Sequence, residues 1–171
     1  IPFVRVQDLD SADKNLQPNK KISSQIANQY KRTKLVGGEI LICVVGSIGK
    51  VAMVPKSWIG ANIARAVCRY MPNKNINRKF IYHYLNNPFI QSFFQRGYKS
   101  INPTLNVNIL EKTLIPLPPL TEQQRIVAKL DQLIQYCDQI EQNINTTKEQ
   151  TNLLLQTVLR EALAPKEKLN K

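Results

Sequence analysis

Acidic residues are scarce in the first two thirds of this 171-residue sequence. Residues 1–120 contain 5 Asp and Glu against 17 Lys and Arg, whereas residues 121–171 contain 7 of each kind. The whole net charge of +12 therefore lies in residues 1–120. A basic field on one part of a chain attracts a polyanion, because binding releases the counterions condensed on it. This distribution favours a nucleic-acid partner over the plainer interpretation of a basic, well-solvated surface.

The residue types that enzymes use most are few, and their spacing does not suit catalysis. His83 is the only histidine, and no Ser/His/Asp or Cys/His arrangement is visible. Glu39 lacks the lysine two places further on that a nuclease metal site would use. Asp8, Asp10 and Asp13 lack the glycine and terminal glutamate of a calcium loop, so we interpret them as turn and capping acids. We expect no catalytic residue, no metal site and no cofactor.

Cysteines and long apolar runs are also rare. Cys43, Cys68 and Cys137 lie far apart in apolar surroundings without CxxC spacing, which predicts buried free thiols and a reducing, cytoplasmic location. No run is long and apolar enough to span a bilayer, and no segment resembles a signal peptide, so we expect no membrane partner. The chain opens at Ile1 without Met, directly in a strand-like stretch, and we expect it to be a fragment.

A long amphipathic helix is predicted for residues 121–164, which no glycine or proline interrupts. Thr121 and Gln124 have capping-box spacing at its start. At 1.5 Å per residue, such a helix is roughly 60 Å long and cannot bury its apolar side against itself. That side is a heptad seam, which calls for a partner helix and whose members alternate four and three residues apart: Ile126, Leu130, Leu133, Cys137, Ile140, Ile144, Thr147, Thr151, Leu154 and Val158. The two threonines either weaken this seam or select a register.

Residues 1–114 have the pattern of an α/β (α+β) domain with a twisted mixed β-sheet and short helices. Predicted strands cover residues 1–6, 39–45, 51–54 and 61–71. Predicted helical segments are 23–29, an aromatic-rich stretch after Asn77 that is broken at Pro88, and a short turn or helix at 108–112. The prolines of residues 115–120 predict a stiff hinge, and residues 165–171 a tail.

Several local features of this domain allow two interpretations. The loop Gly46–Lys50 lacks the spacing of a nucleotide-binding P-loop, so its glycines serve either a tight turn or the approach of a phosphate. Arg65 and Arg69 share one face of the predicted strand 61–71, which is either solvated or DNA-facing. The aromatic residues after Asn77 have helical spacing, which favours core packing over base stacking.

Four motifs resemble the specificity subunit of type I restriction–modification enzymes. Three of them lie in the basic domain: Gly46-Ser47-Ile48-Gly49-Lys50, Ala61-Asn62-Ile63-Ala64-Arg65-Ala66 and Ile101-Asn102-Pro103-Thr104-Leu105-Asn106. The fourth and most specific is a proline-rich hinge followed by Thr121-Glu122-Gln123-Gln124-Arg125-Ile126-Val127 and the heptad helix. The resemblance covers nearly the whole chain, as one target recognition domain (1–114), a hinge (115–120) and one spacer helix (121–164).

The resemblance implies a non-catalytic module that reads one half of a split site in double-stranded DNA. In this family a full subunit has two such halves, whose spacer helices pack antiparallel. The methyltransferase (modification) subunits dock on the helices, and the nuclease/translocase (restriction) subunit joins that complex. The partner helix of this chain would come from a second copy or from the other half of a subunit. The alternative is a non-specific nucleic-acid-binding coiled-coil protein without a restriction role.

These considerations select two sets of candidate residues. The candidates for DNA contact are Lys50, Arg65, Arg96 and Lys99, with Lys20, Lys21, Lys31 and Arg32 as contacts to the DNA backbone. The candidates for helix pairing are Ile126, Leu130, Leu133, Cys137, Ile140, Ile144, Leu154 and Val158.

Overall fold

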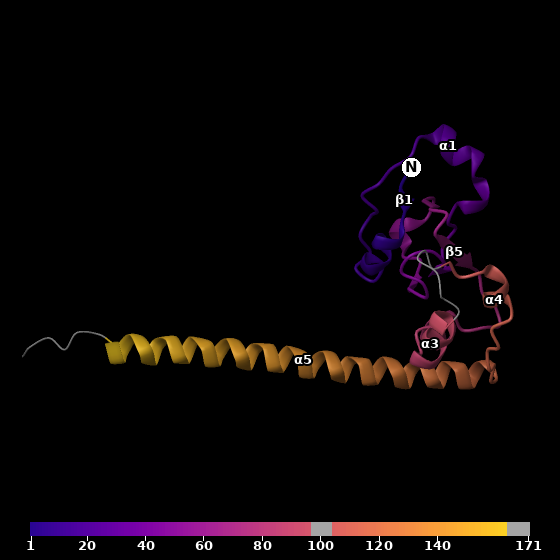
Figure 1. Ribbon diagram of the computed structural model, residues 1–171. Helices are drawn as coiled ribbons and strands as arrows, with labels where there is room; N and C mark the ends of the chain where they lie inside the picture. The colour runs from indigo at the N-terminus through magenta and orange to yellow at the C-terminus, as the bar shows by residue number, and fades with distance from the viewer. Residues whose placement is uncertain (97–103, 164–171) are drawn as a thin grey trace, which may run out of the picture. The chain divides into compact units, whose positions relative to one another are not determined.

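The computed structural model describes residues 1–96 and 104–163, which fold into two units (Figure 1). The first unit is compact and comprises Ile1–Val127, and the second begins at Ala128 within a long helix. The predicted α/β class with a long C-terminal helix is confirmed. The predicted tail, residues 165–171, lies outside the described residues.

The strands form two small sheets. In the parallel sheet, β1 (Phe3–Val4) pairs with β4 (Asn62–Ile63). In the antiparallel sheet, β2 (Ile40–Cys43) lies between β3 (Val51–Met53) and β5 (Val67–Tyr70). The sequence predicts one mixed sheet. The structure contains both parallel and antiparallel strand pairs, but they belong to two separate sheets.

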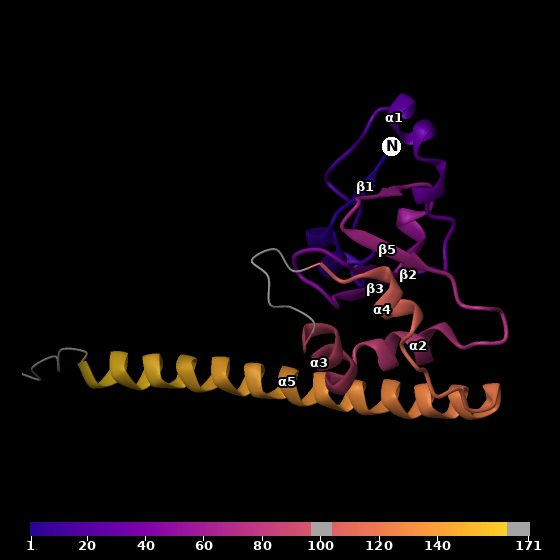
Figure 2. The same cartoon turned by 45° about the vertical axis from the view of Figure 1, so that its right-hand side comes forward.

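The central strand β2 faces a hydrophobic core on each side, which explains its continuous apolar sequence. Leu41 and Cys43 pack in a first core with Trp58 and the small parallel sheet. Ile40 and Ile42 pack in a second core with helices α2 and α3. Figure 2 shows these two helices on the side of β2 and β3 that is opposite to β1.

The helices of the compact unit begin where the sequence predicts. Ser23 caps α1 (Ser24–Gln29), and Asn77 caps α2 (Arg78–Leu85) by accepting hydrogen bonds from the backbone N–H groups of Lys79 and Phe80. Pro88 opens α3 (Pro88–Arg96), a position where its missing N–H costs nothing. The remaining helices are η1 (Val6–Ser11), η2 (Lys31–Thr33), η3 (Lys56–Trp58), α4 (Val107–Glu111) and α5 (Leu120–Leu163).

Three predictions of element boundaries are wrong. The predicted strand 61–71 is two strands in different sheets, because a turn at Arg65 intervenes and the N–H of Val67 donates to the carbonyl of Ala64 at 2.9 Å. The predicted strand 1–6 is reduced to β1, since Val6 already begins η1. Helix α5 starts at Leu120, so Thr121 lies inside its first turn and not at the N-cap position. Alternation in a sequence does not show where a strand leaves its sheet.

Burial of the aromatic and cysteine side chains agrees only in part with the predictions. Phe80 and Phe94 are buried, whereas Phe89, 73% exposed, lies on the outer side of α3. All three cysteines are free, but only Cys43 is buried. Cys137 is exposed in the single chain, as we expect for a residue of the heptad seam that no partner helix covers.

Candidate nucleic-acid interface

The small parallel sheet brings exposed cations from three segments into one region. The segment before α1 pairs with β1 through a bridge between Pro2 and Lys21, and the segment after η2 pairs with β4 through a bridge between Lys34 and Asn62. Since neighbouring strands lie about 4.8 Å apart, the backbones of Lys21 and Lys34 are separated by roughly 14 Å. We call the five exposed candidate cations on or beside these segments the basic cluster: Lys20, Lys21, Lys31, Arg32 and Arg65.

Asn62 fixes the position of η2, which carries two cations of the cluster. Its side chain is 1% exposed, and its Nδ2 donates to the Thr33 Oγ1 at 2.8 Å and to the Tyr30 carbonyl at 3.1 Å. A buried amide costs free energy unless its hydrogen bonds are satisfied, so this arrangement specifies one conformation of the turn. Lys31 and Arg32 extend from that turn into solvent.

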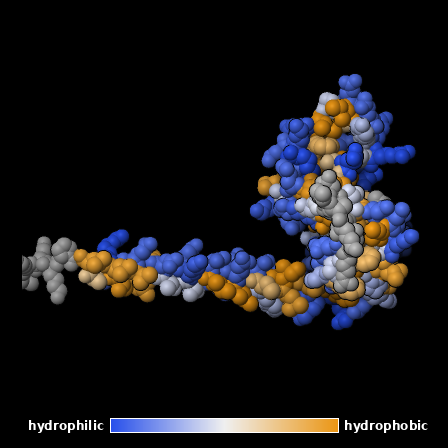
Figure 3. Space-filling view, viewed as in Figure 1, coloured by the Kyte–Doolittle hydropathy of each residue, from blue (hydrophilic) through white to orange (hydrophobic). Residues whose placement is uncertain are grey.

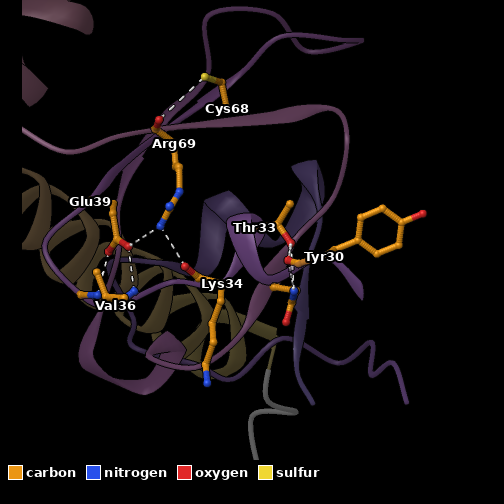
Figure 4. Close-up of polar contacts among 9 residues, drawn as sticks. Tyr30, Thr33, Lys34, Val36, Glu39, Cys68 and Arg69 are labelled. Atoms are coloured by element: carbon orange, nitrogen blue, oxygen red, sulfur yellow. Dashed lines mark hydrogen bonds and ion pairs between the residues drawn. The ribbon is translucent and has the colours of Figure 1, made fainter. Parts of the chain in front are cut away.

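Arg69 has a structural role in the compact unit. The sequence left open whether Arg65 and Arg69 are solvated or face DNA, and Arg69 instead makes contacts within the chain. Its Nη1 donates to the Lys34 carbonyl at 2.9 Å and lies 3.5 Å from Oε1 of Glu39 (Figure 4). The buried carboxylate of Glu39 also accepts hydrogen bonds of 2.7 Å each from the N–H groups of Val36 and Gly37. The Glu39 charge is therefore paired internally, as a buried charge requires. In Figure 4 the ammonium of Lys34 points away from this group.

The other candidate contacts do not lie on the segments that flank the small sheet. Lys50, at the end of the glycine loop between β2 and β3, is half-buried and forms an ion pair with Asp10. Gly46 and Gly49 both have positive φ, so a tight turn accounts for this loop. Arg96 is the last residue of α3, and Lys99 lies outside the described residues. Lys50 is thus engaged in an ion pair within the chain, and its backbone lies across β2 from the residues that follow Arg65.

A second basic surface was missed by sequence reasoning. A cleft of about 780 Å³ lies in the compact unit and is lined by Gly37, Gly38, the start of α2 and the first turn of α5. Among its described lining residues, the only carboxylate is the buried, internally paired Glu39. Its cations are Lys56, Lys74, Arg78 and Lys79. Lys74 precedes the predicted helix by one turn and Arg78 begins it, which could have indicated a shared surface, but Lys56 is distant in sequence.

The most specific sequence motif joins the start of α5 to the compact unit. Gln123 is 3% exposed, and its Oε1 accepts a hydrogen bond of 2.9 Å from the N–H of Asn77 while its Nε2 donates to the Pro118 carbonyl at 2.8 Å. Val127, one turn further on, is buried in the second core. Glu122 and Arg125 form an ion pair of 2.7 Å on the exposed side. The motif thus serves as an anchor for the helix.

The helix-pairing candidates fall into two groups. Ile126 packs against the second core and so belongs to the compact unit. Leu130 is half-buried. The others are exposed along the part of α5 that lies beyond Val127: Leu133, Cys137, Ile140, Ile144, Leu154 and Val158.

The titratable groups with shifted pKa values do not form a reactive site. Burial raises the pKa of the Cys43 and Cys68 thiols, which therefore stay protonated at neutral pH. Burial, with the negative charge of Asp13, also raises the pKa of Tyr82. Within residues 1–96 and 104–163, no group of three or more His, Cys, Asp or Glu side chains is placed to hold a metal ion. None of the helices described there combines the length and the apolar character needed to cross a membrane.

A basic α/β domain anchored to a single long heptad helix is the class of protein that this fold and surface define. The chain belongs to the family of the type I restriction modification DNA specificity domain, whose model matches residues 1–150.

Curated relatives and solved structures agree with this assignment. The chain is 37% identical over 164 residues, or 95% of its length, to the type I restriction enzyme EcoBI specificity subunit of Escherichia coli. It is 32% identical over 66% of its length to the EcoAI specificity subunit of the same organism. These matches span 34% and 19% of the two relatives, so the chain corresponds to about a third or less of their length.

The crystal structure of the HsdS subunit from Thermoanaerobacter tengcongensis has a TM-score of 0.76 to this chain at 26% identity. The alignment covers 99% of this chain and 45% of that subunit. A chain from a structure concerned with complex assembly and conformational transition of the type I R-M system has a TM-score of 0.68 at 25% identity. That alignment covers 95% of this chain and 38% of the other.

Proposed function

We propose that this chain reads one half of a bipartite sequence in double-stranded DNA for a type I restriction–modification complex. The observation that carries the proposal is the basic cluster, which the small parallel sheet and its two flanking bridges bring together in a unit that holds all the net charge of +12. Family membership supports it, since the matching model describes a DNA specificity domain. A field of this kind attracts the DNA backbone, and side chains held in fixed positions can then be compared with base edges.

Within the basic cluster, two kinds of contact are proposed. Lys20, Lys21, Lys31 and Arg32 lie on the segments that flank the small sheet and serve as phosphate contacts. Arg65 lies in the tight turn between β4 and β5, so its exposed side chain starts from a fixed backbone and is the candidate for base contact. Arginine is suited to this role because its guanidinium can bind guanine O6 and N7 in a bidentate manner.

The proposed partners follow from the long helix. The exposed apolar seam of α5 pairs with a second long helix, and the paired helices dock the methyltransferase subunits, to which the nuclease/translocase subunit is added. The relative solved in the context of complex assembly supports such an arrangement. The three free cysteines support a reducing compartment, the cytoplasm.

The salt dependence of duplex binding tests the proposal. If Lys20, Lys21, Lys31 and Arg32 contact about four phosphates, affinity should fall about 150-fold between 50 and 200 mM salt. The double variant K31A/R32A should reduce the slope of log affinity against log salt by about 2. The matched control K129A/R160A removes the same charges from α5 and should leave the slope unchanged. Equal slopes for the two double variants would reject the basic cluster as the interface.

We propose no catalytic role for the chain alone. The described residues of the basic unit provide no arranged nucleophile or metal site. Purified chain incubated with duplex DNA, Mg²⁺ and a methyl donor should therefore neither cleave nor methylate the duplex. Turnover by the chain alone, retained through purification, would contradict this part of the proposal.

A further inference from the structure

One half of the cleft of about 780 Å³ is cationic. Lys56 reaches it from η3, Lys74 from the loop before α2, and Arg78 from the first residue of α2. All three are exposed, and among the described residues none forms an ion pair with them. The Glu39 carboxylate does not neutralise them, because it is buried and paired with Arg69. A concave surface with charge of one sign concentrates the electric field and attracts an anion.

The other half of the cleft is formed by apolar side chains whose exposure the packing of the compact unit does not explain. On the face of that unit shown in Figure 3, apolar residues form small patches among hydrophilic ones. Val36 and Ile59, which are 63% and 56% exposed, both line the cleft, as does Leu120 at the start of α5. Exposed apolar side chains that gather in a concave surface are typical of ligand sites. The cleft therefore suits a ligand with an apolar part beside a charged part.

The two halves meet at Gly37 and Gly38. A Cβ atom on Gly37 would lie 3.1 Å from Cδ1 of Ile59, and a Cβ atom on Gly38 would overlap Nη1 of Arg78. An apolar group and a guanidinium thus lie against neighbouring backbone positions, whose Cα atoms are about 3.8 Å apart. Both glycines also have positive φ, which few other residues adopt. The two parts of a ligand would therefore be bound next to each other.

We propose that this cleft binds a nucleoside phosphate. Its phosphates lie against Lys56, Lys74 and Arg78, since lysine and arginine are the side chains that bind phosphate, arginine in a bidentate manner. Its base lies against Val36 and Ile59, which thereby remove apolar surface from water. The inference is independent of the proposed reading of DNA, because none of these five residues belongs to the basic cluster.

The size of the cleft favours such a ligand over a duplex or an acidic peptide. Its volume of about 780 Å³ lies within the range of roughly 300–1,000 Å³ that small-molecule sites occupy. A cube of this volume has an edge of about 9 Å, whereas the major groove of DNA alone is about 12 Å wide. A duplex therefore reaches only the rim and leaves the apolar half unused. An acidic peptide spreads its charges along a chain, whereas a diphosphate concentrates them within reach of all three cations.

The site includes the start of the long helix. Leu120 and Gln124 line the cleft, and the buried anchor Gln123 lies between them in the first turn of α5. A ligand that contacts this turn and the Gly37–Gly38 segment together should stabilise the folded chain. The midpoint of thermal unfolding should rise by about 5 °C or more at a hundredfold excess over the dissociation constant. An unchanged midpoint at that excess would overturn the site.

Calorimetric titration of the full chain with the nucleoside diphosphates of the four common bases tests the proposal. At least one should bind at one site per chain with a dissociation constant below about 1 mM. Inorganic pyrophosphate reaches only the cationic half and should bind at least about tenfold more weakly, since the base buries apolar surface. Absence of saturable binding by every diphosphate, or pyrophosphate that binds as tightly as the best of them, would overturn the proposal.

A charge variant tests the cationic half. K74A/R78A removes two of its cations and should raise the dissociation constant of the best diphosphate at least about tenfold. The matched control K129A/R160A removes the same charges from exposed positions of α5 outside the cleft and should stay within about twofold of wild type. Equal losses in the two variants would overturn the assignment, and so would displacement of the diphosphate by polyglutamate at equal charge concentration.

An apolar variant tests the other half. Ile59→Ser should weaken binding of the diphosphate about fivefold and leave binding of pyrophosphate unchanged, because only the base contacts Ile59. Ile26→Ser changes an exposed isoleucine of α1 outside the cleft and is the control. Equal loss of diphosphate and pyrophosphate binding in Ile59→Ser would contradict the placement of the base.

Failure of this inference can be distinguished from failure of the proposed function. Duplex binding by K74A/R78A should keep the wild-type salt slope, because the basic cluster is unchanged. A slope reduced by about 2 in this variant, without diphosphate binding by the wild type, would assign the cleft to DNA and overturn the nucleotide site. Diphosphate binding that K74A/R78A loses, together with absence of duplex binding, would remove only the proposed DNA role.

Discussion

The side-chain oxygen Oε1 of Gln123 accepts a hydrogen bond of 2.9 Å from the backbone N–H of Asn77. Asn77 is the N-cap of α2, and Gln123 lies in the first turn of α5. One buried amide therefore connects the start of the long helix to the start of a helix that covers the three-stranded sheet. Its other end donates to Pro118 in the proline-rich hinge, so the same side chain also fixes the segment that enters α5.

Replacement of Gln123 by Leu should destabilise the chain. The change leaves the N–H of Asn77 and the carbonyl of Pro118 without their partner, at a cost of about 1–3 kcal/mol in the free energy of unfolding. Urea unfolding monitored by the fluorescence of Trp58, which is buried in the first core, measures this cost. Gln124→Leu is the matched control, since Gln124 is exposed, and its effect should stay within about 0.5 kcal/mol. Equal effects of the two changes would show that the Gln123 bonds contribute nothing.

Replacement of Asn62 by Ala should affect both stability and DNA affinity. It removes the hydrogen bonds to Tyr30 and Thr33, so the free energy of unfolding should fall by about 1–3 kcal/mol. Because Lys31 and Arg32 extend from the turn that Asn62 fixes, duplex affinity should also fall in conditions where the variant remains folded. Asn28→Ala, an exposed change in α1, is the control. Lower stability with unchanged duplex affinity would separate η2 from the interface.

The Glu122–Arg125 pair predicts a small pH dependence at the start of α5. The hydrogen bond from Arg125 holds the pKa of Glu122 below its ordinary value. A carboxyl whose pKa is lowered by folding contributes stability above its unfolded pKa, and that contribution is lost as pH falls through the folded pKa. Titration of the Glu122 carboxyl by NMR should give a midpoint below that of the R125Q variant. The same midpoint in both proteins would show that the ion pair does not persist in solution.

Replacement of Arg65 by Ala distinguishes base contact from backbone contact. If Arg65 reads a base, the change should cost about 1–3 kcal/mol at one base pair of the preferred site and little on other duplexes. Binding to a series of duplexes, each changed at one base pair, measures this difference. A uniform loss over the whole series would instead place Arg65 on a phosphate.

The elements with strong periodicity could be predicted from the sequence. The helix α5 has a heptad repeat and the buried strand β2 has a continuous apolar run. The N-cap residues Ser23 and Asn77 mark where α1 and α2 begin. The division of residues 61–71 between two sheets could not be predicted. Both halves alternate like one strand, and only pairing with β1 and β2, far away in sequence, separates them.

The candidate interface was predictable in composition but not in arrangement. Sequence reasoning chose Lys50 for its glycine loop, and its ion pair with Asp10 from η1 could not be foreseen from that loop. Arg69 and Glu39 are 30 residues apart, and their contact depends on the pairing of β2 with β5. The cations of the cleft come from three separate segments, so no local pattern marks all four of them. These are tertiary contacts, which neighbouring residues in a sequence do not encode.

Selection from a random pool of duplex DNA is the most direct test of the proposal that this chain reads sequence. The purified chain is incubated with the pool near physiological salt, bound duplexes are amplified, and several rounds are sequenced. Sequence reading predicts enrichment of one short motif, with binding that an RNA competitor does not displace and that weakens steeply as salt rises. A bound pool without any enriched motif, displaced equally by RNA and by unrelated duplex, would contradict it and indicate a non-specific nucleic-acid-binding protein.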